Sequence, residues 1–369
     1  MDKPLFDVRK SFQINFDYLL NYPVDENLKY ECYVDNKNLT SLPKLPNGIV
    51  KLMCNENELT CLPELPIGLE ILVCNENVLT SLPKLPMGLE ILVCNENELT
   101  SLPELPKTLR NLECNTNGIT TLPELPGKLN FLSCVNNNIS SLPELPKSLQ
   151  VLHCDENNLT SLPKLPKNLR YLSCAHNNLT SLPELPETLE YLDCSANLLT
   201  SLPNLPKSLK YLHCDSNHLT SLPKLPAEIT HINCSMNKVT VLPKLPFNLG
   251  VLDCSVNKLT ILPKLPVGLI ELNCTMNDLS YIEDIDFLPK LLSLYCGQNA
   301  YPEDILLING KLLPTKQSIA VRKTICRMRK QFYERRRLVL RSIDSRPSGT
   351  IGSWDLGGIN FQNDRDDVC

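Results

Sequence analysis

The sequence predicts a solenoid, built mainly from β-strands that stack in one continuous row. A phrase of twenty residues, such as LEILVCNENVLTSLPKLPMG at residues 69–88, recurs along the chain without losing register. A fixed period of roughly 20 to 50 residues indicates coils that pack on their neighbours and share one core. Each copy carries a cysteine and, three residues later, an asparagine from Asn57 to Asn277; the cysteines are Cys54, Cys74, Cys94, Cys114, Cys134, Cys154, Cys174, Cys194, Cys214, Cys234, Cys254 and Cys274.

Each copy is expected to contribute one short strand. The segment Ile71–Cys74 alternates between apolar and variable positions, as a strand does. Copies of it would pair in parallel, about 4.8 Å apart, with Leu72 and Cys74 in the core. The return path reads T-S-L-P-x-L-P. Proline lacks an N–H, fixes φ and favours an extended residue before it, so we expect a polyproline-like outer face without helices.

The recurring Asn and Cys positions are interpreted as structural. The Asn amide can bond backbone groups left open where the chain leaves the strand. Zinc needs four ligands that converge on one point, whereas a ladder offers its sulfurs in a row. Parallel neighbours also hold their Cβ atoms too far apart for disulfides. We therefore expect reduced core thiols, no metal, no cofactor and a reducing intracellular compartment such as the cytoplasm.

Acidic and basic residues are distributed unevenly along the chain. Residues 1–300 hold 23 basic and 33 acidic residues, a balance of −10, and residues 301–369 hold 13 and 8, a balance of +5. Lys311–Arg341 holds eleven basic residues against Glu334 alone. No apolar run reaches the length of a membrane span, and the first residues lack the apolar core of a signal peptide. These features argue against a membrane-spanning protein and against export by a cleaved signal peptide, and they leave open delivery into a host cell by another route.

The pattern L-x-x-L-x-C-x-x-N-x-L, followed by L-P-x-L-P, resembles leucine-rich repeats of the short twenty-residue subclass. That subclass is best known from effectors that bacteria inject by type III secretion, and repeats encoded by giant amoebal viruses look similar. The resemblance covers about residues 39–300. It implies a leucine-rich-repeat solenoid, mainly β, with a parallel sheet on its concave face, a polyproline-like convex face and short α-helical caps. A host protein would then be the partner.

The ends of the chain depart from the repeat. Phe12–Tyr22 is expected to form a short helix, and residues 315–343 a basic amphipathic helix. Cys32 and Val34 occupy core positions of a degenerate first coil, since terminal units of a solenoid need specialised caps. The expected organisation is an N-terminal helix and capping coil at 1–38, a solenoid of about 13 coils at 39–300, a basic helical cap at 301–344 and a flexible tail at 345–369.

Positions that vary between copies face solvent, and those on the inner sheet face form rows. Three tyrosines in consecutive copies, flanked by Phe131 and His231, are typical of interface anchors. The alternative is an aromatic ladder that only stabilises the sheet. Histidines and aspartates beside them predict a polar, pH-sensitive contact surface. The predicted partner-binding residues are Phe131, His153, Tyr171, Tyr191, Asp193, Tyr211, His213, Asp215 and His231.

These observations favour a monomeric, non-enzymatic module that binds a protein partner on its concave face. Asp193, His213 and His231 fall in adjacent coils, but an open sheet face makes catalysis or metal binding the weaker interpretation. A second hypothesis is nucleic-acid or anionic-membrane binding through Lys311–Arg341. A third is a ubiquitin ligase with a C-x-D nucleophile, as in some related effectors. It is disfavoured, because only about seventy residues follow the array and no C-x-D motif occurs among them.

Overall fold

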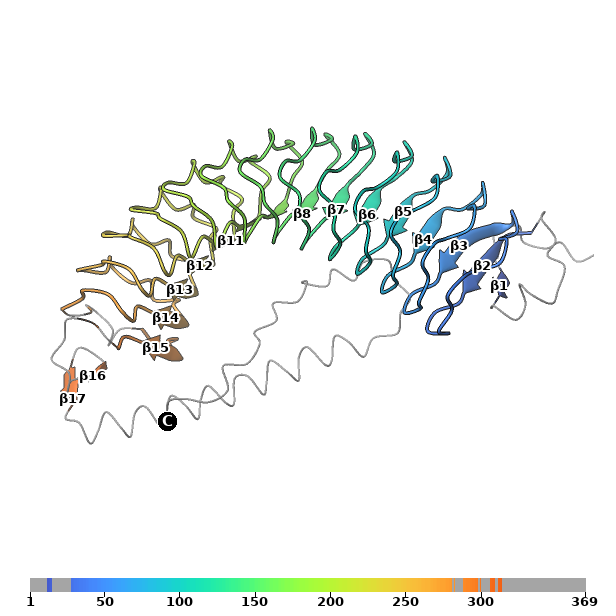
Figure 1. The fold of residues 1–369 in the computed structure, drawn as a ribbon. Coiled ribbons are helices and arrows are strands. Elements are labelled where there is room, and N and C mark those ends of the chain that lie inside the picture. Colours follow the sequence, from blue (N-terminus) through green and yellow to red (C-terminus); the bar gives the residue numbers. More distant parts are fainter. Residues whose placement is uncertain are drawn as a thin grey trace, which may run out of the picture. The chain divides into compact units, whose positions relative to one another are not determined.

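A computed structural model describes residues 12–14, 28–280, 282, 288–297, 299, 306–308 and 311–313. The chain divides into two compact units, Met1–Ser318 and Ile319–Cys369, and all described residues belong to the first. Fifteen strands form one sheet in chain order (Figure 1). They are β1 Phe12–Ile14, β2 Tyr30–Tyr33, β3 Ile49–Met53, β4 Ile71–Val73, β5 Ile91–Val93, β6 Asn111–Glu113, β7 Phe131–Ser133, β8 Val151–His153, β9 Tyr171–Ser173, β10 Tyr191–Asp193, β11 Tyr211–His213, β12 His231–Asn233, β13 Val251–Asp253, β14 Glu271–Asn273 and β15 Ser293–Tyr295.

Neighbouring strands pair in parallel, and equivalent positions of the repeat face one another. Leu72 lies opposite Leu92, for example, as the twenty-residue period predicts. The last coil is longer, so that Asn273 lies opposite Tyr295. In Figure 1 the strands β1 to β15 line the inner side of an arc, and the return segments between them lie on its outer side. The inner sheet is therefore the concave face that the sequence predicts.

One continuous core runs between the sheet and the return path. Leu72, Cys74 and Leu79 are completely buried, and Leu82 and Leu85 almost so. Burying a leucine side chain contributes about 1.5 to 3 kcal/mol, and each coil repeats this set against the next. Between the strands of the repeats, the described return segments contain neither helix nor strand. The two prolines of each copy explain this, since they can neither donate to a ladder nor continue a helix.

The recurring asparagines form the ladder that the sequence predicts. Asn177 Nδ2 donates to the carbonyl oxygens of Cys154 at 3.0 Å, Cys174 at 3.2 Å and Ala175 at 3.0 Å. Its Oδ1 accepts from the backbone N–H of Leu159 at 2.9 Å. One buried side chain thus joins two coils and satisfies backbone groups that no strand partner reaches.

The cysteines of the repeat are unpaired and buried. Burial raises the pKa of Cys74 to about 12. The Cys174 thiol donates to the backbone oxygen of Asp193 in the next coil, at 3.4 Å. These thiols therefore act as small core residues that also bond across coils. Cys61 is the exposed exception among the described cysteines.

A tight turn follows the cysteine in every copy. Its second residue has positive φ although it is not glycine, as at Glu76 with φ 52° and Val256 with φ 53°. The left-handed region costs an ordinary residue about 1 to 2 kcal/mol and a β-branched residue more. Asparagine tolerates this region best among the residues found here, and it occupies the position at Asn36 and Asn136.

One prediction about the ends of the chain needs correction, and another stays open. The helix predicted at Phe12–Tyr22 is wrong at its start, because Phe12–Ile14 is β1 and pairs with Tyr30–Cys32. Its apolar–polar–apolar alternation suits a strand, and the open edge of β2 supplies partners. A hairpin of β16 Leu306–Ile308 and β17 Lys311–Leu313 opens the predicted basic cap. The predicted helix at 315–343 and the tail lie outside the described residues.

No helix occurs among the described residues, so none there is long and apolar enough to cross a membrane. The helical caps are therefore not part of the described fold. Binding of nucleic acid or membrane through Lys311–Arg341 stays a prediction, since all of that segment beyond Leu313 lies outside the described residues.

Candidate protein-binding face

Three positions of each coil lie on the concave side of the sheet, away from the core. Together they form what we call the inner face. They are the first and third residues of the strand and the residue after the cysteine, for example Tyr171, Ser173 and Ala175. The middle residue of the strand and the cysteine point into the core. The nine predicted partner-binding residues all occupy inner-face positions on β7 to β12 or directly after β11.

The aromatic side chains of this face form one continuous row, called the aromatic row below. Tyr171 and Tyr191 lie opposite each other on β9 and β10, and their rings stack with centroids 4.0 Å apart. The other centroid distances are 5.8 Å for Phe131–His153, 4.9 Å for His153–Tyr171, 6.0 Å for Tyr191–Tyr211, 5.7 Å for Tyr191–His213 and 4.7 Å for Tyr211–His231. All seven predicted rings are therefore brought together.

Contact between the rings leaves each of them partly exposed. Tyr211 is 38% exposed, and Phe131, Tyr171 and Tyr191 are partly buried. Burial raises the pKa of the Tyr171 and Tyr191 hydroxyls, and the nearby Asp193 raises it further. Both phenols therefore stay neutral over the whole physiological range. The row is amphipathic, with large apolar surfaces and polar tips, as interface anchors are.

The predicted pH sensitivity fails at His153. Burial between Phe131 and Tyr171 lowers the pKa of His153 to about 4. The imidazole is therefore neutral near pH 7 and acts as another ring of the row. His231 is held by its neighbour, because Thr230 Oγ1 lies 2.8 Å from His231 Nδ1.

Asp193 has a structural role that the sequence analysis missed. Its Oδ1 accepts from the backbone N–H of Ser195 at 3.0 Å and from the Ser195 hydroxyl at 2.6 Å. Asp193 lies opposite His213 in the register, but no hydrogen bond joins the two side chains. Within the described coils, no group of three or more His, Cys, Asp or Glu residues could hold a metal ion.

A second polar ladder runs along the edge of the inner face. In the early coils the residue after the cysteine accepts from the next coil, as Asn75 Oδ1 does from the Asn95 N–H at 2.8 Å. In the later coils the acceptor moves to the third strand residue and pairs with a serine or threonine in its own coil. The later pairs are Asp193–Ser195, Asn233–Ser235, Asp253–Ser255 and Asn273–Thr275. In the sequence, these pairs could have been found as an Asp or Asn at the third strand position with a Ser or Thr two residues later.

Two carboxylates of this face, those of Asp155 and Asp215, are poorly solvated. Asp155 Oδ1 accepts from Ala175 N–H at 2.8 Å and from the Ser173 hydroxyl, yet burial raises the pKa of Asp155 to about 6. Burial, and then repulsion from Asp193, also raises the pKa of Asp215. Among the described residues, no lysine or arginine forms an ion pair with either carboxylate. Neither charge is therefore neutralised by a lysine or arginine of the described residues, although His213 partly offsets the charge of Asp215.

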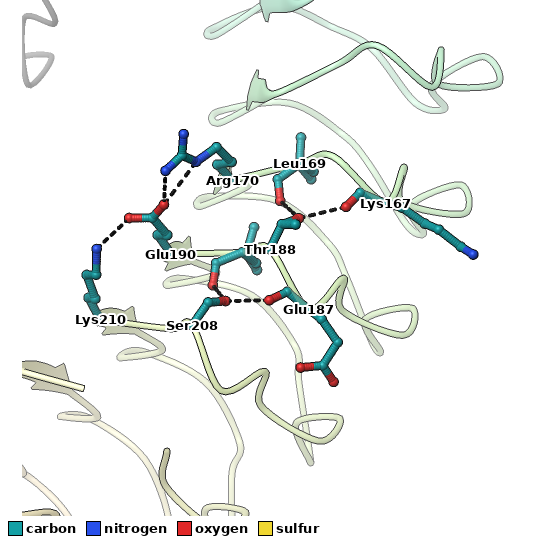
Figure 2. Close-up of polar contacts among 9 residues, drawn as sticks. Lys167, Leu169, Arg170, Glu187, Thr188, Glu190, Ser208 and Lys210 are labelled. Atoms are coloured by element: carbon teal, nitrogen blue, oxygen red, sulfur yellow. Dashed lines mark hydrogen bonds and ion pairs between the residues drawn. The ribbon is translucent and has the colours of Figure 1, made fainter. Parts of the chain in front are cut away.

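By contrast, charged side chains directly before the strands β9 to β11, at the edge of the inner face, form ion pairs. Figure 2 shows Glu190, just before β10, between Arg170 and Lys210, and Glu190 Oε2 lies 2.7 Å from Lys210 Nζ. Beside them the Thr188 hydroxyl donates to the carbonyl oxygens of Lys167 and Leu169, each at 2.7 Å. One coil later, the Ser208 hydroxyl donates in the same way to the carbonyl oxygens of Glu187 and Leu189. These contacts link neighbouring coils along the edge of the inner face, and because the charged side chains are largely exposed, each ion pair contributes at most about 1 kcal/mol.

The fold and its internal ladders define a leucine-rich repeat solenoid. A family model described as leucine-rich repeats in two copies matches residues 167–207. Among solved structures, YopM from Yersinia enterocolitica is 36% identical, with a TM-score of 0.65 over 78% of this chain and 73% of that chain. YopM from Yersinia pestis, a leucine-rich effector protein, is 34% identical, with a TM-score of 0.64 over 74% of this chain and 85% of that chain.

The chain belongs to the leucine-rich repeat family. The functional domain of InlJ from Listeria monocytogenes, which includes a cysteine ladder, is 27% identical, with a TM-score of 0.54 over 72% of this chain and 67% of that chain. The comparison with curated proteins finds no match. Leucine-rich repeat solenoids are protein-interaction modules and typically serve as non-catalytic scaffolds.

Proposed function

We propose that this protein binds a protein partner on its inner face and that the aromatic row is the centre of the contact. The observation that carries the proposal is the row itself. Seven rings from six consecutive coils lie against one another, and all seven residues remain partly exposed. Clustered aromatic side chains on a rigid surface lose little entropy on binding, which suits them as anchors.

Contacts between the rings also stabilise the sheet, and this does not compete with binding. A row that is rigid before the partner arrives costs less to order at the interface. The partner face would span β7 to β12, from Phe131 to His231. Because no catalytic constellation or metal cluster is found among the described residues of the face, we propose a non-enzymatic, monomeric module.

The similarity to YopM, described as an effector protein, favours a partner from a host cell. The many unpaired thiols favour an intracellular, reducing compartment, since buried reduced cysteines persist there.

The test is capture of a partner by the immobilised full chain, followed by measurement of the affinity of the purified partner. The informative variant changes Tyr171, Tyr191 and Tyr211 to valine, a residue that the chain itself uses at this position in Val151 and Val251. The control is Phe247→Val, because Phe247 is 75% exposed and lies away from the inner face, in the turn before β13. We expect the triple variant to lose the partner while Phe247→Val retains it. Equal binding by both variants would contradict the proposal.

A further inference from the structure

The inner face carries several carboxylates and the histidines His153, His213 and His231, but over most of its length no lysine or arginine. Between residues 71 and 275 its positions hold no lysine or arginine. They hold six carboxylates, which are Glu113, Asp155, Asp193, Asp215, Asp253 and Glu271. Five of the six lie in the coils from β8 to β14, which also hold most of the aromatic row. Acid and aromatic residues therefore share one surface.

These carboxylates repel one another. The pKa of Asp155 and of Asp215 is raised first by burial and then, among other causes, by the charge of Asp193. The hydrogen bonds that Asp155 and Asp193 accept come from neutral groups, a backbone N–H and a serine hydroxyl in each case. A cation placed between them would relieve this repulsion and gain strength from the partly desolvated surroundings.

We propose that the occupant of the inner face is an extended, arginine-rich segment of the partner protein, with its guanidinium groups against the aspartates and its side-chain stems along the exposed edges of the aromatic row. This deepens the proposed function and rests on it. A guanidinium is planar and forms two parallel hydrogen bonds with a carboxylate, and the apolar stem of an arginine side chain packs on the exposed edges of aromatic rings. A lysine ammonium cannot form this pair of parallel hydrogen bonds with one carboxylate, so arginine fits this surface better than lysine.

The spacing fits an extended chain. From Asp155 to Asp253 the face covers five strand intervals, which is roughly 24 Å at about 4.8 Å per interval. An extended segment advances about 3.3 Å per residue, so roughly eight residues cross this distance. Alternate side chains of such a segment point to the same side, toward the sheet. Arginine at every second position would therefore place several guanidinium groups along the face.

The test uses the full chain and three fluorescent eight-residue peptides, with arginine, lysine or glutamine at alternate positions and glycine or serine elsewhere. The informative variant is Asp193→Asn with Asp215→Asn. Asparagine already occupies the equivalent positions at Asn233 and Asn75, so the variant keeps the fold and the acceptor for Ser195. The control is Glu76→Gln with Glu96→Gln, which removes the same charge in the turns of early coils, outside the inner face.

We expect the arginine peptide to bind more tightly than the lysine peptide and far more tightly than the glutamine peptide in anisotropy titrations. Binding should fall at least about tenfold in the Asp193/Asp215 variant, change less than about twofold in the control and weaken as salt rises. Equal affinity for the three peptides, or an equal loss in both variants, would overturn the proposal. If the arginine peptide does not bind while the tyrosine variant still loses its protein partner, this inference fails and the proposed function stands.

Discussion

The rings of Tyr171 and Tyr191 lie 4.0 Å apart with their planes 3° from parallel. The two residues are register partners on β9 and β10, so the twenty-residue period itself places them face to face. Stacked aromatic pairs contribute about 0.5 to 1.5 kcal/mol beyond the area that they bury. The same contact therefore stabilises the sheet and prepares the candidate binding surface.

Changing Tyr191 to valine should lower the free energy of unfolding by about 1 to 2 kcal/mol, because Tyr191 contacts three other rings of the row. Urea unfolding followed by circular dichroism measures this. Ile91→Val is the control, since it occupies the same strand position without ring neighbours. A loss in Tyr191→Val no larger than that in Ile91→Val would show that the stack does not stabilise the sheet.

Changing Asn177 to alanine should cost about 2 to 4 kcal/mol, because it leaves three buried carbonyl oxygens and the Leu159 N–H without that amide. The matched control is Asn178→Ala, since Asn178 is exposed and its side chain has no hydrogen bond in the structure. Thermal and urea unfolding of both variants gives the comparison. The account of the ladder is wrong if the two neighbours prove equally tolerant.

Relief of backbone strain should stabilise the turn after Cys254. Val256 has a positive φ of 53° and a β-branched side chain, so Val256→Asn should raise the free energy of unfolding by about 1 kcal/mol. The reverse change, Asn136→Val, should lower it by a similar amount, since Asn136 has the same φ of 53°. Unfolding midpoints measured side by side decide this. The turn geometry would be in doubt if both variants shifted in the same direction.

Asp155 should make stability depend on pH. Its folded-state pKa of about 6 lies above the ordinary value of 3.8, so the folded state binds the proton more tightly than the unfolded state. The resulting stability is present below about pH 4 and is lost as pH rises through 6. Asp155→Asn should therefore stabilise the protein by about 1 to 2 kcal/mol at pH 8 and change little at pH 4.

Unfolding curves at both pH values test this prediction. Glu156→Gln serves as control, because Glu156 is exposed in the adjacent turn and its removal takes away the same charge. A gain in stability for Asp155→Asn that is equal at pH 4 and pH 8 would mean that burial does not hold the proton on Asp155.

Thiol labelling should separate Cys61 from the cysteine ladder. Burial raises the pKa of Cys174 and its equivalents, which leaves little thiolate and no access for a reagent. Among the cysteines from Cys32 to Cys296, iodoacetamide should modify Cys61 first in the native protein and all of them after denaturation. Peptide mapping by mass spectrometry locates the label. Rapid native labelling of Cys174 would contradict the buried ladder.

Much of the fold could be predicted from sequence because the same twenty-residue pattern recurs along the chain. Leu72, Cys74 and Asn77 recur with constant spacing, so their roles in core and ladder follow from the period. Phe12–Ile14 has no copy elsewhere in the chain, and there a local pattern was mistaken for a helix. Its strand form depends on the edge of β2, which a single segment does not show.

The sequence predicted which residues of the candidate site lie together, but not their pKa values or their hydrogen bonds. The rows of the repeat placed Tyr171, Tyr191 and Tyr211 together, since equivalent positions stack. The pKa of His153 and the bond from Ser195 to Asp193 depend on burial and on side-chain direction in neighbouring coils. Those quantities follow from packing in three dimensions, and residue spacing alone does not determine them.

The most direct test of the central claim is an experimental structure of the full chain bound to its purified protein partner. The account predicts partner density on the inner face between β7 and β12, in contact with Tyr171, Tyr191 and Tyr211. Partner density confined to the proline-rich return segments, with the aromatic row left open to solvent, would contradict it.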